Sequence, residues 1–508
     1  MRDVSIPLDM TGSLLKDQCT VWIIAAISFL LFLIGNLPWQ LDDYDQAKQA
    51  FTSFEMIKEG HWFYQQTPHE RVATKPPLVG WVSAGLFAIT RSWEVSWRLP
   101  SLLAAIALAV FLFRHASCAY GSIAGLVAFS AFGLNLVSPR LATLVRTDMP
   151  LALVIFLIGL LIWQKIQRQE EWKPRDRVYL FALLTIAMLI KGPIVYAFLL
   201  PGIALFQWRY SRARPPGAQQ QTAWSGWWPW IASLAAFLLW VTGGILFQPG
   251  FLNEVVMREF LGRFGETIHR SQPLYFYLPH LLHKFSPWSV LIIALAIFHF
   301  ASRRWRISAA FREMPPDTFW LVCWGLGGLI VMSLIPSKRV DRIFPVIPPL
   351  CLLLAAQISG EVSALRRPGG SGWTGVAARR LCLVIALVFA IFFTGSYTTW
   401  KVVTGYRDHR DALATFGRDV RHEAEARHWR YEVVSAKDEG LLLYLRKTHD
   451  IDTDSAVAAW NTGSLDALVV SRKKARGLLT QLRGAAVSQL KLSERKIEQG
   501  TGYVLITR

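Results

Sequence analysis

Long apolar runs separated by short polar segments occupy most of the chain. Runs of this kind, repeated many times, are typical of helices that cross a lipid bilayer. We therefore expect a mainly α-helical, polytopic membrane protein with about 11–13 transmembrane helices. The apolar runs are Val21–Leu37, Pro77–Ile89, Leu99–Phe113, Ile123–Val137, Pro150–Trp163, Tyr179–Ile190, Ile194–Trp208, Trp227–Phe247, Pro287–Phe300, Phe319–Ile335, Ile343–Ala356 and Leu381–Thr398.

The pattern changes after Trp400, and the remaining residues contain no further apolar run of spanning length. The segment Tyr406–Arg427 is charged and helix-like, and short alternating or apolar runs follow it, as expected for strands and helices of a soluble unit. The sequence therefore predicts a transmembrane domain at residues 1–400 and a small α/β domain at residues 401–508. Strands are expected at Tyr431–Ser435, Leu441–Leu445, Ala467–Ser471 and Gly502–Thr507, and a further helix at Lys473–Arg483.

Basic residues between the apolar runs indicate the orientation of the chain, because cytoplasmic loops are enriched in Lys and Arg. Four basic clusters are separated by two runs each, so all four can face the cytoplasm if one run before Arg114 does not cross. The run Pro77–Ile89 is short and opens with two prolines, so we expect it to be an interfacial or re-entrant helix of a first outer loop at about residues 40–97. The clusters contain Lys165 to Arg177, Arg209 to Arg214, Arg303 to Arg312, and Arg366 to Arg380.

This orientation brings polar segments from distant parts of the chain to one outer face. The C-terminal domain is placed on the same side, outside the cytoplasm. The outer segments are Asp42–Lys75, Arg146–Asp148, Lys191–Pro193, Gln248–Lys284 and Pro336–Arg342. We therefore expect a site to be built on that face.

Composition supports a membrane protein and argues against nucleic acid as a partner. The 508 residues are 53% hydrophobic and only 18% charged, with a mean hydropathy of +0.32, which is unusual for a soluble chain of this size. The net charge of +19 comes from short clusters between apolar runs, so it is explained by topology and by contact with anionic lipid or lipid-linked phosphate. The five cysteines show no disulfide framework or CxxC pair. The first apolar run lacks a small-residue cleavage site, so no cleavable signal peptide is expected.

The first outer loop holds three carboxylates within four residues, at Asp42, Asp43 and Asp45. Clustered carboxylates can bind a divalent cation or act as a general base on an acceptor hydroxyl. They can also simply cap the helix that follows. Lys75, next to two prolines, could hold a phosphate as a point charge, or it could be an interfacial lysine whose stem lies along apolar surface.

Further charged residues stand at the outer ends of later runs. Asp148 lies in an Arg-Thr-Asp turn just before a proline, where it either marks a site or caps the next helix. Lys191, Lys338 and Arg342 are cations on the outer face, against the usual charge bias. Binding a lipid-linked phosphate or diphosphate would explain them, since such contacts are strong in a partly dry site.

The long outer loop mixes aromatic and charged residues, which suits a sugar or a polyprenyl headgroup. Its candidates for acceptor or sugar contacts are Glu259, Tyr275 and Tyr277, and Arg263 is a further candidate for the phosphate. His280 and His283 have the spacing of two metal ligands, but no third ligand has a matching spacing nearby. The identity of any metal therefore stays open.

Several motifs in order resemble the bacterial GT-C glycosyltransferases, in particular the group of undecaprenyl-phosphate-aminoarabinose lipid A transferases and protein O-mannosyltransferases. The match covers about residues 20–400. The motifs are Asp45 followed by Glu55–Trp62, Lys75–Leu78, Arg98–Ser101, Thr147–Asp148, Lys191–Pro193, Glu259 to Phe264, Pro287–Trp288, and Ser337–Lys338 through Pro345 and Pro348–Pro349.

The resemblance implies roles for individual residues. Asp45 matches the essential first-loop aspartate of the family, Asp148 the second-loop aspartate, and Lys75 the lysine near the donor phosphate. The sequence departs from the family where Gln46 follows Asp45 and Thr74 precedes Lys75, and where the usual Tyr after Ser-Lys is replaced.

The expected function is transfer of a sugar, with inversion, from a polyprenyl-phosphate donor to an outer-leaflet acceptor at the bacterial inner membrane. The acceptor is expected to be lipid A or another glycolipid. Asp45 and Asp148 would be catalytic, and Asp43 and Arg342 would be further contacts to acceptor or sugar. The phosphate would be held by Lys75, Lys191, Lys338 and Arg263. No cofactor is required by this chemistry, although a divalent cation is compatible with it. A protein O-glycosyltransferase of the same fold and a transporter or flippase of lipid-linked sugars are the alternatives.

Overall fold

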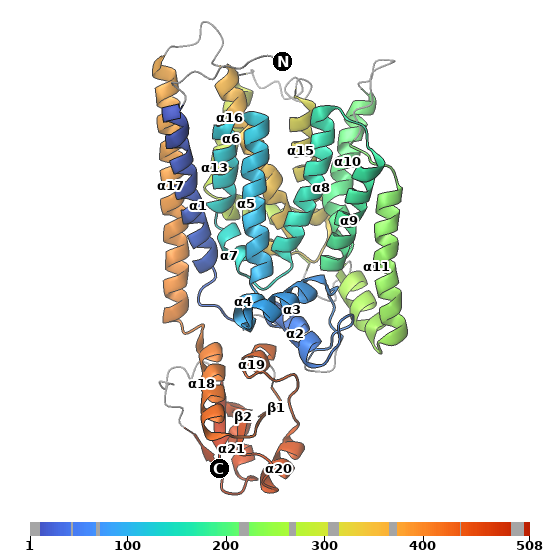
Figure 1. Ribbon diagram of the computed structural model, residues 1–508, viewed down its shortest axis with the longest axis vertical. Helices are drawn as coiled ribbons and strands as arrows, with labels where there is room; N and C mark the ends of the chain where they lie inside the picture. The colour runs from blue at the N-terminus through green and yellow to red at the C-terminus, as the bar shows by residue number, and fades with distance from the viewer. Residues whose placement is uncertain are drawn as a thin grey trace.

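The computed structural model is a helical bundle with a small α/β unit below one end (Figure 1). It describes residues 11–41, 44–67, 72–212, 223–263, 271–302, 314–364, 373–436, 438–488 and 502–508. The expectation of a mainly helical membrane protein with a small sheet is confirmed. The main helices of the bundle are α1 (Thr11–Ile34), α5 (Leu99–Tyr120), α6 (Ser122–Gly133), α8 (Asp148–Arg168), α9 (Pro174–Lys191), α10 (Ile194–Arg212), α11 (Trp228–Phe247), α13 (Trp288–Ser302), α15 (Pro316–Leu334), α16 (Ile347–Ala364) and α17 (Trp373–Arg407).

Six helices in the described ranges are long and apolar enough to cross a bilayer, and a bent pair, Leu274–Lys284 with Trp288–Ile297 at 107°, would add a seventh. This is fewer than the expected 11–13, because several apolar runs form helices shorter than the roughly 20 residues that span about 30 Å. The chain is thus a multi-span membrane protein, and its shorter apolar helices are not long enough to be counted as spans by themselves. The shorter apolar helices are Cys19–Ile34, Leu78–Thr90 and Ser122–Gly133.

The first loop folds as three helices at one end of the bundle: α2 (Tyr44–Lys58), α3 (Leu78–Thr90) and α4 (Trp93–Ser96). In Figure 1 they lie beside one another below the long helices rather than among them, α3 included. The first turn of α8 and the last turn of α9 reach this end of the bundle. Other short elements are α7 (Ser138–Ala142), η2 (Leu252–Phe260), η3 (Leu261–Arg263), η4 (Leu274–Phe276), α12 (Tyr277–Lys284) and η5 (Val340–Val346).

Local sequence explains where the helices that carry site residues begin and end. Helix α8 begins with Asp148, whose carboxylate lies at the positive end of the helix dipole. Pro150 follows in the first turn, where the N–H that proline lacks would have no partner within the helix. Helix α9 closes with Lys191, a cation at the negative end of the dipole, and Gly192 follows at φ 76° as its C-cap. Charged groups are thereby placed at helix ends on one side of the bundle.

The C-terminal unit is a four-stranded mixed sheet of order β1-β2-β4-β3, with β1 and β2 parallel and the other pairs antiparallel. Successive residues of a strand point to opposite faces, so one face packs on α18 and α19 and the other on α20 and α21. Helix α17 continues through residue 400 to Arg407 before this unit begins. The elements are α18 (Ala412–Arg427), β1 (Tyr431–Val434), α19 (Glu439–Tyr444), α20 (Thr453–Asn461), β2 (Ala467–Ser471), α21 (Arg472–Leu479), β3 (Ala486–Val487) and β4 (Tyr503–Thr507).

The prediction of a strand at Leu441–Leu445 was wrong, because this segment belongs to helix α19 and the residue that follows it. All five side chains are buried, and a short apolar run buried on every side gives no periodicity that separates a strand from a helix. The other three expected strands are present as β1, β2 and β4.

Candidate active site

Eight charged side chains from five separate segments lie together at the end of the bundle next to α2. We call them the polar cluster: Asp45, Lys75, Arg146, Asp148, Lys191, Arg339, Asp341 and Arg342. Three carboxylates and five cations are present, so the cluster carries surplus positive charge. A surplus of this kind suits an anionic ligand.

Asp45, in the first turn of α2, is held by two arginines from other segments. Its Oδ2 lies 3.5 Å from Nη2 of Arg146 and is ion-paired with Arg339. Burial alone would raise the pKa of Asp45, but the charges of Lys75, Arg339 and Arg146 outweigh it and leave the pKa below the usual value. The carboxylate is therefore ionised at neutral pH and is a weak Brønsted base.

Asp148 and Lys191 form a second, more deeply buried pair. Nζ of Lys191 donates to Oδ1 of Asp148 at 2.5 Å, and only 11% and 9% of the two side chains are exposed. The pair joins the start of α8 to the end of α9, and both groups act electrostatically on Lys75. A buried pair of this kind fixes the position of the start of α8 relative to the end of α9, because separating the two side chains would leave an uncompensated buried charge.

Lys75 is the cation that connects the two aspartates. Its ammonium is within electrostatic range of both Asp45 and Asp148. Burial lowers the pKa of Lys75 to about 7, against the opposing pull of the two carboxylates. An anion bound here would return the lysine to its charged form, so Lys75 is poised to respond to a phosphate.

Arg146 and Asp341 form the inner contact of the cluster. Nη1 of Arg146 donates to Oδ2 of Asp341 at 2.7 Å, and Oδ1 of Asp341 lies 3.8 Å from Nη1 of Arg140. Arg146 thus bridges Asp341 of η5 and Asp45 of α2. Arg146, Arg339 and Asp341 were not predicted individually as site residues, although all three lie within the outer segments Arg146–Asp148 and Pro336–Arg342.

Arg342 and Lys338 come from the same outer segment, but only Arg342 belongs to the polar cluster. Arg342 donates to Ser337 O at 2.7 Å and is in electrostatic range of Asp45 and Asp148. Lys338 instead donates to Gln272 O at 2.8 Å, so its ammonium secures the outer loop. The role predicted for Lys338 in phosphate binding stays a prediction.

The outer-loop candidates differ in their burial. Tyr277 is fully buried and lies in electrostatic range of Arg342 and Asp148, whereas Tyr275 is 66% exposed. Glu259 is half-buried in η2. The side chain of Arg263 and the whole of Asp43 lie outside the described residues.

Known proteins share this architecture. The family model for dolichyl-phosphate-mannose-protein mannosyltransferases matches residues 74–245. An undecaprenyl phosphate-alpha-4-amino-4-deoxy-L-arabinose arabinosyl transferase of Sodalis glossinidius is 25% identical over 397 residues, which are 72% of this chain and 63% of the relative. One from Pectobacterium carotovorum is 25% identical over 371 residues, 70% of this chain and 62% of the relative.

The crystal structure of ArnT from Cupriavidus metallidurans bound to undecaprenyl phosphate matches with a TM-score of 0.67 at 17% identity, covering 96% of this chain and 97% of that chain. The resemblance to the GT-C glycosyltransferases is confirmed. At this identity the structural match shows the GT-C fold. The chain spans 63% and 62% of the lengths of the two curated relatives.

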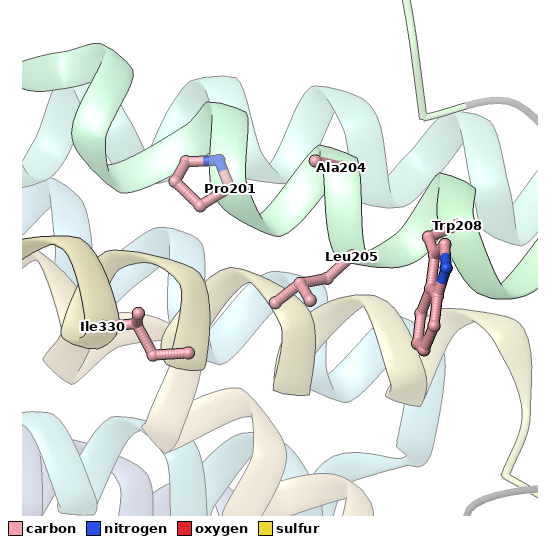
Figure 2. Close-up of a pocket in the computed structure, with 5 residues that line it drawn as sticks. All are labelled: Pro201, Ala204, Leu205, Trp208 and Ile330. Atoms are coloured by element: carbon pink, nitrogen blue, oxygen red, sulfur yellow. The ribbon is translucent and has the colours of Figure 1, made fainter.

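An apolar groove lies on the GT-C bundle at a different level from the polar cluster. It has a volume of about 470 Å³ and lies between α10 and α15. Figure 2 shows side chains of α10 and the side chain of Ile330 on α15 facing the same space. The α10 residues are Pro201, Ala204, Leu205 and Trp208. The charges of the cluster and the apolar groove are thus separate parts of the molecule.

Metal ligands do not gather anywhere in the part of the chain that the structure describes: no three His, Cys, Asp or Glu side chains come together in a suitable group. Of the two histidines considered from spacing, His280 packs against the ring of Phe276 at 4.5 Å between ring centroids.

Proposed function

We propose that this protein is an integral-membrane glycosyltransferase that moves a sugar from a polyprenyl-phosphate donor to an outer-leaflet acceptor, lipid A or another glycolipid. The observation that carries the proposal is the meeting of Asp45, Lys75, Asp148 and Lys191 in one cluster from four distant segments. The curated relatives, which are named as arabinosyl transferases using undecaprenyl-phosphate aminoarabinose, support it. The cluster and the C-terminal unit would face the periplasm of a bacterial inner membrane, since the basic residues at 165–177 and 209–212 lie toward the opposite end of the bundle.

In the reaction, an oxygen of the acceptor forms a bond to the anomeric carbon on the face opposite the phosphate. The bond between that carbon and the phosphate oxygen breaks, and the polyprenyl phosphate leaves with its electron pair. Lys75 and Lys191 would hold the phosphate and stabilise the charge that it gains. Attack from the opposite face inverts the anomeric centre.

The lowered pKa of Asp45 bears on which acceptor is used. A hydroxyl acceptor must lose a proton, and a strongly ionised carboxylate is a poor base for this. An acceptor phosphate already carries the nucleophilic oxygen anion and needs no base. Asp45 would then help to position the groups around the acceptor and would stabilise the positive charge that develops on the sugar. The low pKa of Asp45 therefore favours a phosphate-bearing acceptor such as lipid A.

The proposal is tested by measuring sugar transfer by the purified protein in nanodiscs. A radiolabelled polyprenyl-phosphate sugar is the donor and lipid A is the acceptor. Label on the glycolipid with an inverted anomeric configuration supports the proposal. Label on added protein would instead make the chain a protein O-glycosyltransferase. Movement of the donor between leaflets without transfer to any acceptor would make it a transporter.

The pH dependence of phosphate binding should report on Lys75. Because its pKa in the free protein is about 7, binding a phosphate dianion above that pH requires uptake of a proton, and affinity should fall by up to about tenfold per pH unit. We expect the dissociation constant of undecaprenyl phosphate to rise between pH 7 and 9, and to be nearly flat in Lys75→Arg, whose guanidinium stays charged. Equal slopes in both proteins would place the titrating group elsewhere.

The apolar groove between α10 and α15 should hold the polyprenyl tail. Helix α10 begins three residues after Lys191, and Pro201 lies about 10 Å along it, so the groove lies farther from the cluster along the same helix. Filling it with Ala204→Trp should weaken binding of a long-chain polyprenyl phosphate at least about tenfold, while a short-chain analogue keeps its affinity. Equal losses for both chain lengths would contradict this placement. Val110→Trp, at a 54% exposed position on α5, is the control.

A further inference from the structure

Helix α19 of the C-terminal unit contacts the backbone just before Asp45. The backbone N–H of Leu41 donates to Oη of Tyr444 at 2.7 Å. Gly440 lies against the same residue so closely that a Cβ added there would be 2.5 Å from Leu41 O. Leu41 and Tyr444 are 1% and 4% exposed, so this contact is dry and tightly packed.

The buried face of α2 shares one hydrophobic core with the C-terminal unit. Residues of both, together with α4, form a single contiguous group rather than two cores that meet at a polar surface. The α2 members are Ala47, Ala50, Phe51 and Phe54, and those of α18 and α19 include Leu413, Phe416, Leu441, Leu442 and Tyr444. The helix that carries Asp45 is thus packed against the C-terminal unit along its length.

A charge interaction also links α19 to the residues of α2 that follow Asp45 in the sequence. Lys48, three residues on and therefore on the same face of α2, is within electrostatic range of both Asp45 and Glu439. Glu439 is 5% exposed and starts α19. Burial raises the pKa of Glu439 to about 7, with Lys48 opposing the rise.

We propose that α19 is a positioning element for the active site: Gly440 and Tyr444 hold the chain before Asp45, and Glu439 faces Lys48 after it. The C-terminal unit is then part of the catalytic apparatus, although Glu439, Gly440 and Tyr444 act through α2 and not on the reacting atoms. This inference rests on the proposed function for the role of Asp45. Its physical basis is that a displacement of about 1 Å in a reacting group can cost about 100-fold in rate.

The test compares two identical substitutions in the full-length protein. Gly440→Ala forces a shift at Leu41 O, whereas Gly477→Ala makes the same change in α21, where an added Cβ meets no heavy atom within 4 Å. We expect Gly440→Ala to increase hydrogen exchange of the amides at residues 44–48 and to lower kcat at least about tenfold, with the KM for donor unchanged. Gly477→Ala should change neither quantity.

Tyr444→Phe is a milder variant that removes only the hydroxyl and keeps the ring in the core. It should shift exchange and kcat in the same direction as Gly440→Ala, and it decides the matter if Gly440→Ala does not fold. Unchanged exchange at residues 44–48, or increased exchange with unchanged kcat, would overturn the inference. If the native protein transfers no sugar, the proposed function fails, and the exchange measurement alone decides whether α19 positions α2.

Discussion

Asp45→Asn should reduce sugar transfer at least about 100-fold while undecaprenyl phosphate still binds. The substitution keeps the size of the side chain but removes the negative charge that faces Arg339 and Arg146. The transition state then loses the carboxylate that would stabilise positive charge on the sugar. The bound phosphate loses nothing, because its cations remain and one competing anion is gone. We therefore expect kcat to fall and the dissociation constant of undecaprenyl phosphate to stay equal or decrease.

The matched control is Asp466→Asn in the C-terminal unit. Asp466 also accepts from an arginine, Arg430 at 3.0 Å, but this pair is more exposed and lies next to strands β1 and β2, outside the polar cluster. It should leave transfer within about twofold of the native rate, since exposed pairs contribute little. Full transfer by Asp45→Asn would remove Asp45 from the mechanism, and a parallel loss of binding would make it a structural residue of the cluster.

The placement of charged groups could be predicted from the sequence because topology restricts them. The orientation inferred from basic loops placed Asp45, Lys75, Asp148 and Lys191 on one face, and the structure brings these four together. Their chemical roles stay predictions. Each stands at or near the end of an apolar run, so the topology that the basic loops indicate brings all four to the same side of the membrane.

Partner choice within the cluster could not be predicted in the same way. Arg146 pairs with Asp341 across 195 positions, and any of several cations would have satisfied the same sequence pattern. The contact of Lys338 with a backbone carbonyl of the outer loop depends on how that loop folds. Long-range pairing is a property of packing, which hydropathy and charge patterns do not encode.

The C-terminal unit shows the same limit on a smaller scale. Three of its strands could be predicted from their alternating or β-branched residues. Leu441–Leu445 was wrongly predicted as a strand, because a short apolar run that is buried on all sides shows no helical periodicity. What the sequence did not reveal is that this segment forms the helix that packs beside Asp45. An apparently separate domain is thereby joined to the site through one hydrophobic core.

Arg146→Met should destabilise the protein and abolish transfer together. The side chain is 7% exposed and serves both Asp341 and Asp45, so its removal leaves a buried carboxylate without its closest partner. Breaking a buried pair from one side costs about 3–5 kcal/mol. We expect a clear drop in the thermal midpoint in detergent and a loss of transfer of at least about 100-fold.

Adding Asp341→Asn to Arg146→Met separates the two effects. The double variant no longer strands a buried charge at Asp341, so most of the thermal midpoint should return, whereas transfer should not, because Asp45 still lacks the cation that orients it. Arg258→Met, which breaks an exposed pair with Glu254, should change stability by less than about 1 kcal/mol. If the double variant regained transfer together with stability, Arg146 would act only on the fold, and the orientation of Asp45 would depend on Arg339 and Lys75 alone.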